Sequence, residues 1–163
     1  GSDPDAAVYW LARMLAGVES LEFIGRRLLI LASEDIGLAN PNALLLAQSC
    51  FESIRIIGNP ESRIILSQTV IYLANSPKSN SAYNAINKAM AYVEQTGNLP
   101  VPLHLRNAPT RLMKDLNYGA DYKYPHDYPG SWVEQNYFPE VPNRPVFYSP
   151  SEQDKINRGT PSK

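Results

Sequence analysis

The stretch DPDAAVYWLARMLAG, residues 3–17, has the pattern of one complete amphipathic helix. Asp3 is a preferred N-cap residue, and Pro4 stands at the first helical position, where its missing N–H costs nothing. Apolar side chains recur at helical spacing, and Gly17 ends the pattern. The apolar face consists of Ala7, Leu11, Met14 and Leu15. Because similar punctuation is repeated along the chain, this stretch predicts an all-α fold.

Five further helices are expected from the same start and stop signals. The second helix is expected over residues 19–33, and the third from Asn40-Pro41 to Gly58. The fourth is expected to start at Asn59-Pro60, and the fifth to run from Ser79 or Asn80 to Gly97. A short sixth helix is expected from Pro109 to about Gly119. The apolar face of the second helix is expected to carry Leu21, Ile24, Leu28 and Leu31, and that of the third Leu44, Ala47, Phe51 and Ile54. The inward face of the fourth is expected to carry Ile64, Ile65, Ile71 and Tyr72 together with Gln68, and that of the fifth Tyr83, Ile86, Met90 and Val93.

The composition changes after Gly119, where prolines recur and aromatic rings become dense. A disordered tail would be poor in aromatic residues. We therefore expect a helical bundle over residues 1–119, an ordered but irregular extension over 120–152 that packs its rings on the bundle, and a frayed tail over 153–163. The rings are those of Tyr122, Tyr124, Tyr128, Trp132, Tyr137, Phe138, Phe147 and Tyr148.

Charge and cysteine content narrow the class of protein. Apolar residues make up 44% of 163, which is enough to form a core, and 15 basic against 16 acidic side chains leave a net charge of −1. A free-standing nucleic-acid binder usually carries a basic excess. The lone cysteine, Cys50, fits a reducing cytosol and is expected to be buried and unreactive. No apolar run reaches the roughly 18 residues of a membrane span, and the abrupt start without a Met indicates a fragment.

The third and fourth helices carry more apolar residues than one packed face requires. A helix that is apolar nearly all round lies at the centre of a domain or also faces a partner chain. Both explanations remain open at this stage. On the second, we predict an interface formed by Leu45, Leu46, Ile65 and Leu66.

The polar residues define candidate contacts but no defensible catalytic motif. The chain has no phosphate-binding P-loop and no Cys/His spacing for a metal. The candidate anion or partner contacts are Arg26, Arg27, Lys78, Arg106 and Arg111. The candidates for structural hydrogen bonds are Glu34, Asp35, Asn80, His104, Asn107 and Asp127. An enzyme hypothesis would pair His104 as a base with Asp127 or Asp121, with Arg106 nearby, but no nucleophile accompanies them.

A series of short sequence blocks, in a fixed order, covers about residues 1–150. Single blocks could match by chance, but the ordered series is specific for one protein family. The blocks are Gly1–Ala7, Tyr9-Trp10, Ala12–Met14, Arg26–Leu28, Ala32–Gly37, Asn40-Pro41, Tyr72–Ala74, Pro77–Asn80, Val101–Thr110, Leu112–Lys114, Tyr118-Gly119, His126-Asp127 and Tyr137–Glu140. Together they resemble the C-terminal region of the RarA/MgsA/Werner-helicase-interacting-protein family of AAA+ ATPases. The sequence departs from the family after Tyr148-Ser149-Pro150, where Gln153–Ile156 stands in place of a Gly-x-Glu element.

This resemblance implies properties that the composition does not show. The fold would resemble the helical collar of clamp-loader subunits, and the chain would join copies of itself into a homotetramer. The ATPase module, with its ATP and Mg²⁺, would lie outside this chain, which itself would hold no cofactor and catalyse no reaction. The parent would act in the cytoplasm, associated with the nucleoid, on DNA forks and ends with single-strand binding protein and recombinase. The alternative function is a module that docks a replication protein or DNA.

Overall fold

The computed structural model describes residues 1–155, and every regular element in that range is helical. The α-helices are α1 (Pro4–Ala16), α2 (Leu21–Leu31), α3 (Asn42–Ile57), α4 (Ser62–Asn75), α5 (Ser81–Thr96) and α6 (Arg111–Asp115). A π-helical turn, η1 (Ala32–Ile36), continues α2, and the remaining short turns are η2 (Gly37–Ala39), η3 (Leu103–Leu105), η4 (Pro125–Asp127) and η5 (Pro129–Ser131). The prediction of an all-α fold is confirmed. Within the described range, no helix is both long and apolar enough to cross a membrane.

The chain divides into two compact units, and the division falls inside α5. The helical body comprises residues 1–89 and the segment from Phe147 onward, and the loop unit comprises Met90–Val146. The predicted boundary after residue 119 is therefore wrong. It followed the change in composition, whereas a structural unit is defined by contacts, and these return residues 147–155 to the helical body.

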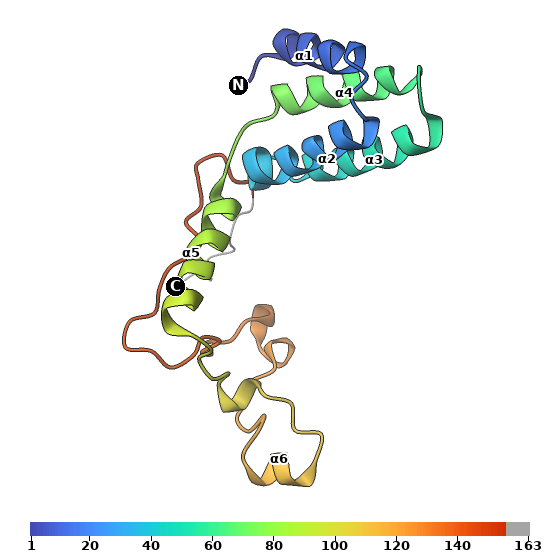
Figure 1. Cartoon of the computed structure of the whole chain (residues 1–163). Coiled ribbons are helices and arrows are strands. Elements are labelled where there is room, and N and C mark those ends of the chain that lie inside the picture. Colours follow the sequence, from blue (N-terminus) through green and yellow to red (C-terminus); the bar gives the residue numbers. More distant parts are fainter. Residues whose placement is uncertain (156–163) are drawn as a thin grey trace. The chain divides into compact units, whose positions relative to one another are not determined.

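The helical body is built from three close helix pairs. Helix α1 packs on α4, α2 packs on α3, and α3 packs on α4, as Figure 1 shows in blue to green. Two groups of buried side chains fill the space between them. The first consists of Leu11, Ile24, Cys50, Ile54, Leu66 and Val70, and the second of Ala32, Ile36, Ala43, Ala47 and Leu73. Cys50 is buried as predicted.

Gly25 lets α2 and α3 approach closely. A Cβ atom at this position would lie 2.6 Å from Cδ2 of Phe51 and 3.0 Å from Cδ1 of Ile54. Because both distances are shorter than an ordinary van der Waals contact, a larger residue would push the helices apart or displace both side chains. The glycine, which breaks the apolar pattern of α2, thus has a packing role.

The buried face of α4 differs from the one expected from its large apolar residues. Leu66, Val70 and Leu73 are buried together with Ser62 and Thr69, whereas Ile64, Ile71 and Tyr72 are exposed. The two hydroxyl groups satisfy their hydrogen-bonding capacity within the backbone, since Ser62 donates to the Gly58 carbonyl at 2.6 Å and Thr69 to the Ile65 carbonyl at 2.9 Å. Their burial therefore carries little desolvation cost.

The predicted helix-start signal is confirmed for α1, whereas those for α3 and α4 differ from the structure. Asp3 caps α1, because its carboxylate accepts the Ala6 N–H at 3.0 Å. Asn40 does not cap α3, because its amide instead donates to the hydroxyls of Tyr72 and Ser76. The Asn59-Pro60 bond is cis, and α4 begins two residues later, at Ser62.

The loop unit is ordered without a buried apolar core. Its aromatic rings are between 39% and 55% exposed, so they are not buried within the unit, and their packing on the helical bundle stays a prediction. The rings concerned are Tyr122, Tyr124, Tyr128, Trp132 and Tyr137. Phe138 is half-buried, and its ring lies against Tyr92 and under the Arg144 guanidinium. Several side chains of this unit bond to the backbone, as His104 does to Asn136 and Arg106 does to Val101.

Candidate functional site

An exposed apolar surface lies along the groove between α3 and α4. Leu45, Leu46 and Tyr72 line one hollow, and Ile71 and Tyr72 line the adjoining one, with Gln68 common to both. We call Leu45, Leu46, Ile71 and Tyr72 the α3/α4 surface. Leu45 is 68% exposed, Ile71 40% and Tyr72 37%. An apolar cluster on helices that also build the core is typical of a protein–protein contact.

Only two of the four predicted interface residues lie on this surface. Leu66 is 0% exposed and belongs to the core, so its prediction as an interface residue is wrong. Ile65 is half-buried against the same core, whereas Leu45 and Leu46 face the groove. The error arises because adjacent residues on a helix point about 100° apart, and a run of three apolar residues does not reveal which one faces inward.

The predicted basic contacts are dispersed and mostly engaged within the chain. Arg26 lies 3.9 Å from Glu22 in an exposed ion pair. Arg106 donates to the Val101 carbonyl at 2.7 Å and to the Tyr118 hydroxyl at 3.1 Å. Arg111 is exposed at the first position of α6, in the loop unit, whereas Arg27 lines a cavity of the helical body. The structure therefore does not assemble the five residues into one positive patch.

Lys78 closes the C-terminal end of α4. Its ammonium donates to the backbone carbonyls of Leu73 at 3.0 Å, Ala74 at 3.3 Å and Ser76. Partial desolvation lowers the pKa of Lys78, and the nearby Asp35 carboxylate opposes that shift. All three ammonium hydrogens have acceptors, and the positive charge complements the negative end of the helix. The expectation that Lys78 contacts an external anion is thus replaced by an internal role.

Another hollow of the helical body opens between α1, α2 and α4. It has a volume of about 610 Å³ and a mainly apolar lining that includes Trp10, Leu28 and Leu73. The charged side chains of Arg27, Asp35 and Lys78 also line it. Its size and composition are those of a site that accepts an apolar group beside a polar one.

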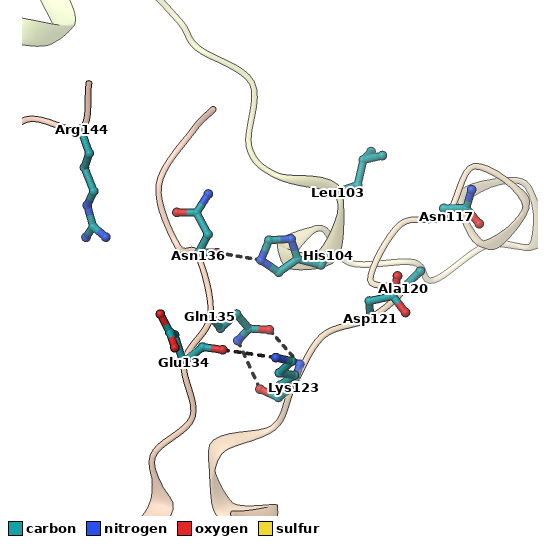
Figure 2. Close-up of a pocket in the computed structure, with 10 residues that line it drawn as sticks. All are labelled: Leu103, His104, Asn117, Ala120, Asp121, Lys123, Glu134, Gln135, Asn136 and Arg144. Atoms are coloured by element: carbon teal, nitrogen blue, oxygen red, sulfur yellow. Dashed lines mark hydrogen bonds between the residues drawn. The ribbon is translucent and has the colours of Figure 1, made fainter. Parts of the chain in front are cut away.

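The loop unit contains a polar hollow of about 880 Å³, shown in Figure 2. His104 Nε2 lies 2.7 Å from the Asn136 carbonyl oxygen. Gln135 accepts the Lys123 backbone N–H at 2.8 Å and donates to the Lys123 carbonyl at 3.2 Å, which joins two distant loop segments. Side chains of both charge signs line the hollow, namely Lys123, Arg144, Asp121 and Glu134. This mixture gives no preference for an anion.

The catalytic pair required by the enzyme hypothesis is not formed. His104 bonds to a backbone carbonyl rather than to a carboxylate. The backbone N–H of Asp127 donates a turn hydrogen bond to the Tyr124 carbonyl. Asp121 lines the same hollow as His104, but within residues 1–155 no hydrogen bond joins the two. A base needs a partner that orients its ring for proton transfer.

Of the remaining candidates for structural hydrogen bonds, Asp35 and Asn80 make hydrogen bonds that the structure shows. The Asp35 carbonyl accepts the Ser79 N–H at 2.8 Å and so links η1 to the start of α5. Asn80 Oδ1 accepts from the Asn84 amide at 3.0 Å, one helical turn later. Glu34 is half-buried in η1, and Asn107 is exposed in the loop unit.

The sequence interpretation missed Asp154, whose carboxylate accepts several hydrogen bonds. Its Oδ2 accepts the Ser81 hydroxyl at 2.8 Å, the Tyr148 hydroxyl at 3.0 Å and the Ser151 N–H at 3.2 Å. Burial raises the pKa of Asp154, but hydroxyl hydrogen bonds, including that of Ser79, outweigh burial and hold this pKa well below its usual value. The prediction of a frayed tail is therefore wrong for residues 153–155, and residues 156–163 lie outside the described range. The available signal was Ser151-x-x-Asp154, a capping-type spacing.

Comparison with known proteins places this all-helical chain in a defined class. The family model described as "MgsA AAA+ ATPase C terminal" matches residues 1–160, and the chain belongs to this family. The family resemblance and its AAA+ class, expected from the sequence, are thereby confirmed.

Three relatives illustrate the match. The chain is 47% identical to Replication-associated recombination protein A of Coxiella burnetii and 43% identical to the protein of that name from Bacillus subtilis. It is 44% identical to ATPase WRNIP1 of Dictyostelium discoideum. The matches cover 98%, 96% and 95% of this chain but only 35%, 37% and 18% of the respective relatives. The chain thus spans about a third or less of the curated relatives named here.

Proposed function

We propose that this chain is the self-assembly domain of an AAA+ ATPase and joins its copies into a homotetramer. The observation that carries the proposal is the α3/α4 surface, where Leu45, Ile71 and Tyr72 remain between 37% and 68% exposed after the body has folded. Covering such a surface with a second copy removes apolar area from water. Closed symmetry is the usual result for a homomer.

The proposal extends to the parent protein. Its remaining part binds ATP and Mg²⁺ and hydrolyses ATP, and this chain holds neither cofactor. The parent acts on DNA forks and ends in fork maintenance, repair and recombination, with single-strand binding protein and recombinase as partners, in the cytoplasm and near the nucleoid. Support comes from the family description and from relatives called Replication-associated recombination protein A.

Light scattering on two charge variants tests the assembly. Leu45→Asp places a carboxylate on the α3/α4 surface, whereas Leu112→Asp makes the same change in α6, where the leucine is equally exposed at 68%. The unchanged chain and Leu112→Asp should have a mass near four times 18.2 kDa, and Leu45→Asp should dissociate toward 18.2 kDa. A monomeric unchanged chain at tens of micromolar, or a Leu45→Asp tetramer, would contradict the proposal.

A second candidate function, docking of a replication protein or DNA, is favoured by the hollow between α1, α2 and α4. Arg27 lines this hollow, and no ion pair engages it among residues 1–155. For the DNA form, Arg27→Gln should weaken binding of single-stranded DNA, whereas Arg26→Gln should not. The affinity should fall as salt rises, because phosphate contacts release counterions. A folded chain that fails to bind DNA at low salt would rule out this form.

A further inference from the structure

The segment 147–155, which we call the strap, crosses the junction between α4 and α5. At its far end, the Lys155 N–H donates to the Leu38 carbonyl at 2.9 Å. At its centre, the Ser151 hydroxyl lies 3.0 Å from both Ser79 Oγ and Asp154 Oδ1. The strap thereby contacts the chain before α3 and the chain before α5, both of which belong to the helical body.

The polar contacts of the strap converge on one carboxylate. Phe147, Tyr148 and Asp154 are half-buried, and the other residues of the strap are exposed. Asp154 Oδ2 alone accepts from Ser81, Tyr148 and Ser151. Hydrogen bonds to an ionised acceptor are roughly twice as strong as neutral ones. The charged hydrogen bonds of the strap are therefore concentrated in a single side chain.

Beneath the strap lie polar groups that are shielded from water. Ser79 and Ser81 are each only 5% exposed, and the Ser81 N–H lies 3.3 Å from Ser79 Oγ at the start of α5. The charge of Asp154 also complements the positive N-terminal end of this helix. If the strap lifts, these hydroxyls and the helix end can be solvated by water, which keeps the opening local rather than global.

We propose that the strap is a latch over the α4–α5 junction and that Asp154 holds it closed. The latch opens and closes as a unit while α1–α4 stay folded, and its opening uncovers Ser79, Ser81 and the Leu38 carbonyl. The inference is independent of self-assembly.

Amide hydrogen exchange on the whole chain tests the latch through the Lys155 N–H, which reports strap opening without bonding to Asp154. The Cys50 N–H, inside α3, serves as the reference for global unfolding. Asp154→Asn removes the charge, and Glu152→Gln makes the same change on an exposed strap residue. We expect Asp154→Asn to accelerate exchange at Lys155 roughly 10- to 100-fold, as loss of charged hydrogen bonds implies, and Glu152→Gln to leave it unchanged.

The urea dependence of exchange separates a latch from an integral part of the core. A local opening exposes little surface, so exchange at Lys155 should vary weakly with urea, whereas exchange at Cys50 should vary strongly. Tyr148→Phe, which removes one donor to Asp154, should give a smaller acceleration than Asp154→Asn. The proposal is overturned if Lys155 follows the urea dependence of Cys50, or if Asp154→Asn and Glu152→Gln exchange alike.

Discussion

The helical body and the loop unit are ordered by different forces. Every buried apolar side chain among residues 1–155 lies in the body, and none lies between residues 90 and 146. The loop unit depends on side chains that bond to the backbone, as Gln135 does to Lys123 and Arg106 does to Val101. The difference teaches that a hydrophobic core unfolds cooperatively, as one unit, whereas a loop held by separate polar contacts opens locally, one contact at a time.

The largest expected effect comes from truncating the core of the body. Leu66→Ala removes a fully buried side chain between α1, α3 and α4 and should lower the free energy of unfolding by about 2–5 kcal/mol. Leu45→Ala on the exposed side of α3 should change it by less than about 0.5 kcal/mol in the monomer. Urea unfolding followed by circular dichroism measures both, and equal losses would contradict the assigned burial.

A smaller and local effect is expected in the loop unit. Gln135→Ala removes both bonds to the Lys123 backbone, each with a net worth of about 1 kcal/mol. Amide exchange should accelerate at Lys123, while the urea midpoint of the helical body stays unchanged. Gln95→Ala, on an exposed position of α5, is the control. A shift in the unfolding of the body would show that the two units do not open separately.

Acid should weaken the strap through Asp154. Despite the opposing effect of burial, hydrogen bonds hold the folded-state pKa of Asp154 below its unfolded value. The stabilisation is therefore fully present above about pH 4 and is lost as the pH falls toward the folded-state pKa. The difference in thermal midpoint between the unchanged chain and Asp154→Asn should narrow on acidification below this pH. A constant difference down to strong acid would contradict the assigned cause.

The mildest test changes no residue and measures how fast the thiol of Cys50 is labelled in the folded body. Burial raises the pKa of Cys50, and a hydrogen bond with the Thr69 hydroxyl partly opposes this shift. Because only the thiolate reacts readily, labelling of the native chain should be at least roughly a hundredfold slower than labelling in urea. Reaction at the same rate in both conditions would show that α3 opens locally, which would remove the contrast between the units.

Sequence patterns located most helices and little of the site. Asp3-Pro4 and Gly97 marked helix ends because N-capping and the left-handed conformation of a glycine are local properties, and Gly17 also stands at a helix end, although its φ is −81°. Leu66 was misplaced because α4 is apolar on several sides, and only its packing against α1 and α3 selects the buried face. Lys78 was misjudged because its partners are backbone carbonyls that become free only where α4 ends. Asp154 was missed because one of its partners, Ser81, lies 73 residues away.

By itself, the sequence determined the all-helical class, the helix starts that depend on local capping, the burial of Cys50 and the family. These follow from interactions within a few residues or from an ordered set of motifs. Tertiary structure alone decided which face of α4 is buried, where the two units divide, and that residues 147–155 close over the start of α5. Those outcomes depend on contacts between distant segments, and a one-dimensional pattern does not encode which of several chemically similar residues will meet.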